Sequence, residues 1–440
     1  MKYQHKLKQF IAFTGLFVIA MGWWGCKVEP ILDPNNPSIG SVTQSAQLGE
    51  LQNLVVGTEA GMRIYLGTYL DDVSMIGREY YRFAASDPRV TGDLLGKGGA
   101  TLDNNTFYTT NPFAGRYRVV KNTNVLIQAL QNTKAGISDD QRKAGIAYAK
   151  TVQAYELLMV FNLEYENGIR VDVNDPDKLG PFLSMKESLD AIQNLLNEAN
   201  NDLKGNTADL PFTTTLYSKK ASDFSKFNRA LAARVAVYRQ DWALANTALS
   251  ESFLSLTGSL TDGSYYLFST GGGDLLNPVF FPTNTPAAEV RVTHPGWITD
   301  ATPGDARLSK APKRTTTATQ DNLNSDYDFF VYTTNVAPIP IIRNEELVLL
   351  YAEVKVWQNS FPDAIVAINR IRTAANLPPY AGAVTHDALI TEILYQRRYS
   401  LFGEGHRWID MRRYGLLNTL PIDRAGDDVW QQFPRPATEN

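Results

Sequence analysis

The sequence predicts a mostly α-helical protein that carries one loop-rich, partly β insertion. Two long blocks, roughly residues 46–255 and 341–415, have apolar residues at alternating steps of three and four, as a helix with one buried face requires. Between them, from about residue 257 to 340, Gly, Pro, Asn and Thr cluster, and regular helices cannot run through such a stretch. A chain of 440 residues is long enough to bury a large core.

Residues 1–25 have the pattern of a secretory signal peptide. Basic residues precede an uncharged apolar stretch, Phe10 to Trp24, which is shorter than the roughly 20 residues of a membrane-spanning helix. Cys26 is the only cysteine and follows Gly25, an arrangement that resembles a lipobox, in which the cysteine becomes the lipidated amino terminus. We therefore expect an acylated Cys26 that holds the protein on a membrane. A permanent transmembrane anchor and an incidental cysteine in a cleaved peptide are the alternatives.

The segment from residue 26 to 45 is predicted to be an extended tether. Pro30, Pro34 and Pro37 prevent a regular helix there, and the Asn and Ser content favours extended or turning backbone. Such a tether would lift the folded domain off the membrane.

Individual helices follow from the apolar periodicity. Residues 117–131 and 189–203 each place apolar side chains on one face, and 143–163 is apolar on several sides, which suits a helix packed between neighbours. Asn124 interrupts the apolar face of the first of these helices. A buried amide that hydrogen-bonds a neighbouring helix explains this position better than contact with a ligand.

Two stretches look like copies of one helix-turn-helix unit. Ala233 and Ala245 are 12 residues apart, and so are Ala352 and Ala364. Small residues at such places let two antiparallel helices approach closely, which is the packing of tetratricopeptide units. The sequence thus predicts tetratricopeptide-like helix pairs, although the usual Trp and Gly are missing.

The carboxy-terminal part combines helical periodicity with charge. Residues 347–354 and 364–375 form two apolar stripes whose helices should pair antiparallel, and a third helix at 390–401 places Arg397 among aliphatic side chains. Such an arginine needs a carboxylate partner. We favour a buried structural ion network over an active site. Its predicted members are Arg343, Glu346, Glu353, Arg397, Glu404, Arg407 and Asp410.

At these residues the sequence resembles the SusD/RagB family, the lipid-anchored nutrient-binding proteins of the Bacteroidetes outer membrane. The matching elements are a helix at Arg343–Glu353, a helix end at Ala367–Pro378 and the segment FGEGHRWIDMRR at Phe402–Arg413, which is the most specific of the three. Weaker similarity covers the amino-terminal half of the chain. The departures from the family pattern are Gln396 and Ser400, where glutamates are usual, and Gly403, which replaces a larger residue.

The resemblance implies a helical scaffold of tetratricopeptide-like units that supports ligand-binding loops, with a TonB-dependent outer-membrane transporter as partner. It also implies a lipid-anchored protein that faces the cell exterior and binds a nutrient, either a glycan or oligosaccharide or, as the alternative, a peptide. A purely structural interaction scaffold is a third hypothesis. We expect one SusD-like domain over residues 46–440, with a helical part at 46–256, a loop-rich ligand region at 257–340 and the signature part at 341–440.

A glycan site would present aromatic rings to sugar faces, with Asp, Asn and Arg side chains nearby to hydrogen-bond hydroxyls. Two segments offer this mixture, one before residue 90 and one in the loop-rich region. The candidate ligand residues are Arg78, Tyr80, Tyr81, Asp87, Tyr265, Tyr266 and Trp297. For each aromatic ring, burial beneath a loop is an equally good interpretation.

Charge and motifs argue against other classes of protein. With 42 Lys and Arg against 46 Asp and Glu the net charge is −4, which does not suit nucleic acid binding. The four histidines are dispersed, and neither a metal-binding motif nor a nucleophile motif occurs. We therefore expect no cofactor, no metal and no enzyme activity. A glycoside hydrolase that uses carboxylates such as Asp71 and Asp72 is the least favoured alternative.

Overall fold

The computed structural model describes residues 39–175 and 177–439. The predicted signal peptide, Cys26 and most of the predicted tether lie outside these residues. The chain divides into two units, Met1–Val42 and Thr43–Asn440, and the second contains all the sites discussed below. Within the described part, no helix combines the length and the apolar character needed to cross a membrane.

The end of the predicted tether is helical, which corrects the expectation of extended backbone up to residue 45. Helix α2 covers Ile39–Ser45. Its first residue follows the last proline of the segment, Pro37, and the seven helical residues include no proline. Nothing in this stretch therefore blocks helical hydrogen bonding.

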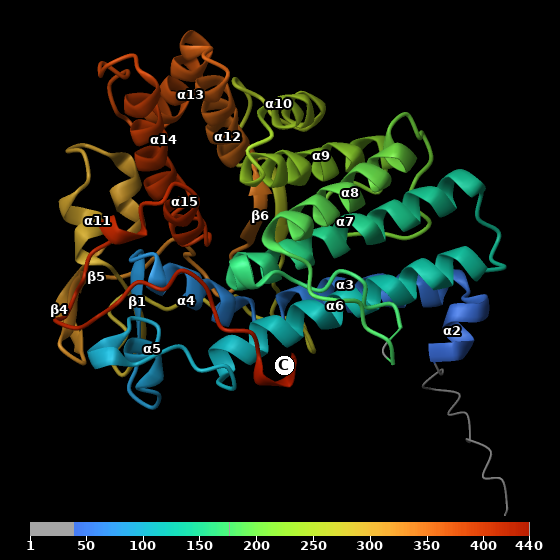
Figure 1. Ribbon diagram of the computed structural model, residues 1–440, viewed down its shortest axis with the longest axis horizontal. Helices are drawn as coiled ribbons and strands as arrows, with labels where there is room; N and C mark the ends of the chain where they lie inside the picture. The colour runs from blue at the N-terminus through green and yellow to red at the C-terminus, as the bar shows by residue number, and fades with distance from the viewer. Residues whose placement is uncertain (1–38, 176, 440) are drawn as a thin grey trace, which may run out of the picture. The chain divides into compact units, whose positions relative to one another are not determined.

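The amino-terminal block is helical, as predicted. Its helices pack in chain order, and Figure 1 shows α6, α7, α8 and α9 side by side, with α3 against α6. Its elements are α3 (Leu48–Arg63), α4 (Leu66–Ile76), β1 (Tyr80–Ala84), α5 (Arg89–Gly92), α6 (Phe107–Asn132), α7 (Asp139–Glu164), α8 (Met185–Leu203), α9 (Ala221–Tyr238) and α10 (Trp242–Glu251).

Three details of these helices confirm the periodicity argument. In α8 the predicted apolar face is buried, and the helix begins where Ser184 and Glu187 form a capping box. In α7 every residue from 151 to 164 is buried, as expected for a helix between neighbours. Asn124 of α6 accepts a hydrogen bond of 2.6 Å from the Gln153 side chain of α7, so it is a buried amide that joins two helices.

The middle region supplies three short antiparallel ladders, each of two strands, within the described chain. β1 pairs with β3, β2 with β6 and β4 with β5. The elements are β2 (Gly263–Tyr266), β3 (Glu289–Thr293), α11 (Pro295–Thr299), β4 (Lys313–Gln320), β5 (Leu323–Tyr327) and β6 (Ile339–Arg343). This region was predicted to consist of loops and strands. Among its described residues it also contains one short α-helix, α11, and a 3₁₀ turn at Ala306–Lys310.

The carboxy-terminal block is helical again. It contains α12 (Asn344–Trp357), α13 (Phe361–Ala374), α14 (His386–Ser400) and α15 (Arg407–Arg413). Both predicted helix pairs form, α9 with α10 and α12 with α13, and the paired alanines of each are fully buried. Pro362 lies in the first turn of α13, where its missing N–H costs no hydrogen bond.

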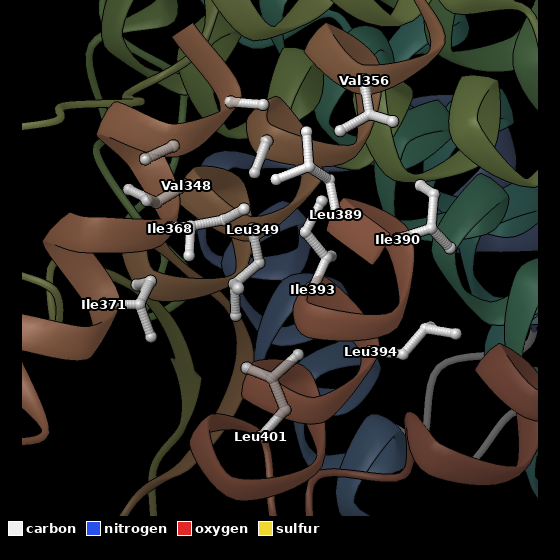
Figure 2. Close-up of a cluster of buried hydrophobic side chains, with 13 residues drawn as sticks. Val348, Leu349, Val356, Ile368, Ile371, Leu389, Ile390, Ile393, Leu394 and Leu401 are labelled. Atoms are coloured by element: carbon white, nitrogen blue, oxygen red, sulfur yellow. The ribbon is translucent and has the colours of Figure 1, made fainter. Parts of the chain in front are cut away.

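Helices α12, α13 and α14 enclose an apolar cluster. Figure 2 shows Val348 and Leu349 of α12, Ile368 of α13, and Leu389 and Ile393 of α14 pointing toward one another. All five side chains are buried. Packing of this kind is the main stabilising contribution for short helices, because each is too short to be stable alone.

The predicted charged residues of this block form more than one group of buried ion pairs. Arg397 of α14 pairs with Asp410 of α15 at 2.6 Å, and Arg413 joins Asp410 to Glu353. Burial alone would raise the pKa of Asp410, but Arg397 and Arg413 outweigh it and lower the pKa to about 2. The Asp410 carboxylate therefore stays ionised in the interior.

The other members find different partners. Arg343 pairs with Glu404 at 2.7 Å, and Glu346 pairs at 2.6 Å with Arg234, a residue of α9 that the sequence did not indicate. Arg407 forms no ion pair within the described residues, so its predicted membership of the buried ion network is wrong.

Candidate functional site

A cavity of about 450 Å³ opens between the end of α3, the start of α4 and the ladder of β1 and β3. Its lining includes Arg63, Tyr65, Asp71, Arg82 and Arg291, and we call it the Asp71 pocket. The volume falls in the range of about 300–1,000 Å³ that small-molecule sites occupy.

Two arginines face the pocket from adjacent strands. The register of β1 and β3 places Arg82 directly opposite Arg291. Like charges in such positions repel each other, so the pair needs a shared anion. Asp71 of α4 supplies it, because its carboxylate accepts hydrogen bonds from Arg291 at 2.6 and 2.7 Å and lies 3.6 Å from Nε of Arg82. The hydroxyl of Tyr80 donates a further bond of 2.9 Å to the same carboxylate.

An aromatic ring supports both guanidinium groups. Phe281 lies with its ring centroid 5.4 Å from Arg82 and 5.3 Å from Arg291, within the range of cation–π attraction. Within the described chain, Nη1 of Arg291 is buried and has no hydrogen-bond partner. Arg291 therefore keeps one unsatisfied donor in the wall of the pocket.

Asp72, next to Asp71 in α4, also lines the pocket but has a different environment. Both of its carboxyl oxygens are buried without a partner among the described residues. Burial, followed by the charge of Asp71, raises the pKa of Asp72 well above its usual range. In its neutral form it can donate one hydrogen bond and accept others.

Tyr65 presents a ring at the mouth of the pocket. It has a left-handed backbone with φ of 57°, which costs a residue other than glycine roughly 1–2 kcal/mol, and it caps the start of α4. Its side chain is 37% exposed. Gly115 of α6 leaves room for it, since a Cβ there would lie 3.1 Å from the tyrosine ring. Strained backbone of this kind is often found at binding sites.

The comparisons with known proteins agree with this architecture. Residues 308–439 match the model of the SusD family. The carboxy-terminal part of the chain therefore carries the sequence signature of the SusD family. None of the curated proteins matches the sequence.

Solved structures extend the likeness over most of the chain. A SusD superfamily protein from Bacteroides vulgatus has a TM-score of 0.70 at 16% identity, covering 89% of this chain and 96% of its own. A SusD-like carbohydrate binding protein from the same species has a TM-score of 0.63 at 16% identity, with coverages of 84% and 83%. The surface glycan-binding protein A from Bacteroides uniformis has a TM-score of 0.61 at 14% identity, with coverages of 83% and 88%. At these identities the likeness shows the SusD/RagB fold.

The predicted ligand residues do not converge. Asp87 lines the Asp71 pocket and pairs with Arg89. Tyr80 lies behind the pocket wall, where it holds Asp71. Among the predicted residues before position 90, these two are therefore the ones connected with the cavity.

Arg78 and Tyr81 are interior residues, which corrects their assignment to a ligand surface. The Arg78 guanidinium donates to the backbone carbonyls of Pro421 and Asp428 at 3.0 and 2.7 Å. Tyr81 packs against His294 with a ring distance of 5.1 Å. Both side chains join the β1 region to other parts of the chain. Packing therefore explains why an arginine and a tyrosine stand at these positions.

The aromatic residues of the loop-rich region are also separated from the pocket. Trp297 is fully buried and stacks on Phe402 at 4.3 Å, so the expectation that it faces a ligand is corrected. Tyr266 is buried as well and donates to the hydroxyl of Tyr155 at 2.8 Å. Tyr265 is half-buried, and its hydroxyl donates to the backbone carbonyl of Thr261.

Sequence reasoning missed Arg82, Arg291 and Phe281. One signal existed for Arg82, because alternation along a strand places Tyr80, Arg82 and Ala84 on one face. Arg291 and Phe281 carry no local signal, since they reach the site only through the pairing of β1 with β3. Among the residues that the structure describes, no group of three or more His, Cys, Asp or Glu side chains could hold a metal ion.

Proposed function

We propose that this protein binds oligosaccharides in the Asp71 pocket. The observation that carries the proposal is the combination of an exposed ring, Tyr65, with a buried and unsatisfied donor, Arg291, in one cavity of about 450 Å³. Sugar rings have apolar faces that stack on aromatic rings and hydroxyls that hydrogen-bond to fixed polar groups. Asp72 adds a second unsatisfied polar group.

The names of two structural neighbours support carbohydrate as the ligand class. One is a SusD-like carbohydrate binding protein and another a surface glycan-binding protein. We extend the same class to this chain because its pocket has the matching chemistry.

The proposal predicts that removing the aromatic walls weakens glycan binding. We expect Tyr65→Ala and Phe107→Ala, which remove the two rings that line the pocket, each to weaken binding about tenfold, since one stacked ring is worth roughly 1–1.5 kcal/mol. The measurement is electrophoresis of the full-length chain through gels that contain amylopectin, xylan or pectin, followed by titration with oligosaccharides of the retarding polymer.

Trp357→Ala is the matched control, because Trp357 is also 37% exposed but lies at the end of α12. It should leave retardation unchanged. Equal retardation of the parent and both pocket variants would contradict the proposal. Retardation by none of the polymers, combined with peptide binding that Tyr65→Ala abolishes, would assign the pocket to peptides. Release of reducing sugar by the parent chain would instead indicate a hydrolase.

Delivery to a transporter at the cell surface is the second part of the proposal. A lipid-anchored protein that captures oligosaccharides outside the outer membrane needs a channel, and the SusD/RagB family implies a TonB-dependent transporter. Co-purification of the full-length chain with an outer-membrane transporter tests this partner.

The anchor leads to a separate prediction. We expect Cys26→Ala to abolish fractionation with membranes while the protein stays folded, because acyl chains attached to this thiol would supply the membrane affinity. Western blotting of membrane and soluble fractions measures it. Unchanged membrane fractionation of the variant would exclude Cys26 as the anchor.

A further inference from the structure

A second cavity, of about 310 Å³, lies where the end of α7, the start of α8, the end of α9 and α15 meet. It is lined by Tyr165, Leu189, Tyr238, Ile409 and Arg412 among others, and we call it the Arg412 pocket. It shares no lining residue with the Asp71 pocket. Neither the SusD/RagB signature nor the proposed glycan site gives this cavity a role.

Arg412 brings a buried positive charge to this cavity. Its side chain is 6% exposed, and its guanidinium lies 4.0 Å from the ring centroid of Tyr165 and 4.4 Å from that of Trp408. It donates to the backbone carbonyls of Gln431 and Asn162, at 2.9 and 2.8 Å. The Nε–H group is buried and has no partner in the described residues.

No carboxylate neutralises Arg412 within the part of the chain that the structure describes. Burial lowers the pKa of Arg412 to about 10, so the guanidinium keeps its charge at neutral pH. A buried charge without a counter-ion is costly, and a ligand anion would remove that cost.

The other cations around the cavity are already paired. Arg413 pairs with Glu353 and Asp410 on the side of α12. Lys186 pairs with Asp190 at 2.6 Å, and Arg239 pairs with both Asp190 and Asp241, at 2.7 and 3.7 Å, so these two cations face two carboxylates. One positive charge, that of Arg412, is left over. A ligand with a single negative charge therefore balances the cavity better than a doubly charged phosphate.

The remaining walls are apolar or aromatic. Phe161, Leu189 and Ile409 are buried apolar side chains, and Tyr165 and Tyr238 add two rings. At about 30 Å³ for each water-sized group, the volume accommodates roughly ten non-hydrogen atoms. A carboxylate carried on one ring has this size and polarity.

We propose that the Arg412 pocket binds a small monocarboxylate with an apolar ring, whose carboxylate pairs with the guanidinium of Arg412. Charge-assisted bonds between a guanidinium and a carboxylate are among the strongest hydrogen bonds in proteins. The apolar walls would cover the ring.

The test is calorimetric titration of the full-length chain with phenylacetate, phenylacetamide and inorganic phosphate. We expect phenylacetate to bind, and the neutral amide and phosphate to bind at least tenfold more weakly. Absence of phenylacetate binding, or equal binding of the amide, would overturn the proposal.

Two variants locate the binding. Arg412→Met removes the charge, and Met185→Trp fills the cavity from α8 without touching the buried arginine contacts. Both should abolish phenylacetate binding, and Met185→Trp should keep the parent melting temperature and the parent glycan retardation. Val384→Trp, at a position that is 54% exposed, is the control for the added ring. Undiminished binding to Met185→Trp would exclude this cavity, whatever the result for the Asp71 pocket.

Discussion

Replacing Asp410 by alanine is expected to lower the free energy of unfolding by about 3–5 kcal/mol, the usual cost of breaking a buried ion pair on one side. Asp410 is the only ion-pair partner of Arg397 in the described chain, and it also pairs with Arg413. Nη1 and Nη2 of Arg397 are already buried without partners. The variant would therefore leave a fully buried cation with no counter-ion. Urea denaturation followed by circular dichroism measures the change.

Asp209→Ala provides the matched control. Asp209 also pairs with a cation, Lys219, at 2.8 Å, but both side chains are exposed. Exposed pairs contribute about 0–1 kcal/mol, so the control should unfold close to the parent. If Asp410→Ala and Asp209→Ala had the same denaturation midpoint, the role of Asp410 as a buried counter-ion would be wrong.

Replacing Gly403 by alanine is the second large expected effect, a loss of about 2–5 kcal/mol in the free energy of unfolding. Gly403 has a left-handed backbone with φ of 73°, and a Cβ at this position would overlap the ring of Phe329. The conformation costs an alanine roughly 1–2 kcal/mol, and overpacking adds about 1–3 kcal/mol. The same denaturation experiment measures the loss.

Gly415→Ala separates the two causes. Gly415 has a similar φ of 66°, but no atom lies within 4 Å of the added Cβ, so only the backbone cost of roughly 1–2 kcal/mol applies. Combining Gly403→Ala with Phe329→Ala should recover part of the overpacking loss as a coupling energy. Additive effects of these two substitutions would contradict the proposed overlap. The contact also explains why this chain has glycine where a larger residue is usual in the family.

The sequence predicted the helical scaffold well because the relevant signals are local. The apolar stripe of residues 189–203 and the capping pair Ser184 and Glu187 define α8 without reference to the rest of the chain. The paired alanines likewise indicated both helix hairpins, because close helix packing requires small residues. Helix α2 is not apparent in the sequence, because the prolines that precede it favour extended backbone while its own seven residues give only a weak helical signal.

The candidate site was predicted less well because it depends on contacts between distant segments. Composition indicated Trp297 and Tyr266 as rings for a ligand, but both are core residues of the loop-rich region. The polar walls of the Asp71 pocket come from α4, β1 and β3, and no motif joins these elements in the sequence. Arg234 was missed for the same reason, since its partner Glu346 lies on a different helix pair.

The pairing of β1 with β3 also bears on the order of folding. Tyr80 is opposite Thr293, so the helices α5 to α10 must be enclosed in one loop before the two arginines can meet over Phe281. Closing so long a loop costs more chain entropy than forming the local contacts between neighbouring helices. The helical hairpins can therefore form early. The walls of the Asp71 pocket form only when β3 pairs with β1. A chain whose helical hairpins have formed but whose β1 and β3 are not yet paired would therefore lack the walls of the Asp71 pocket.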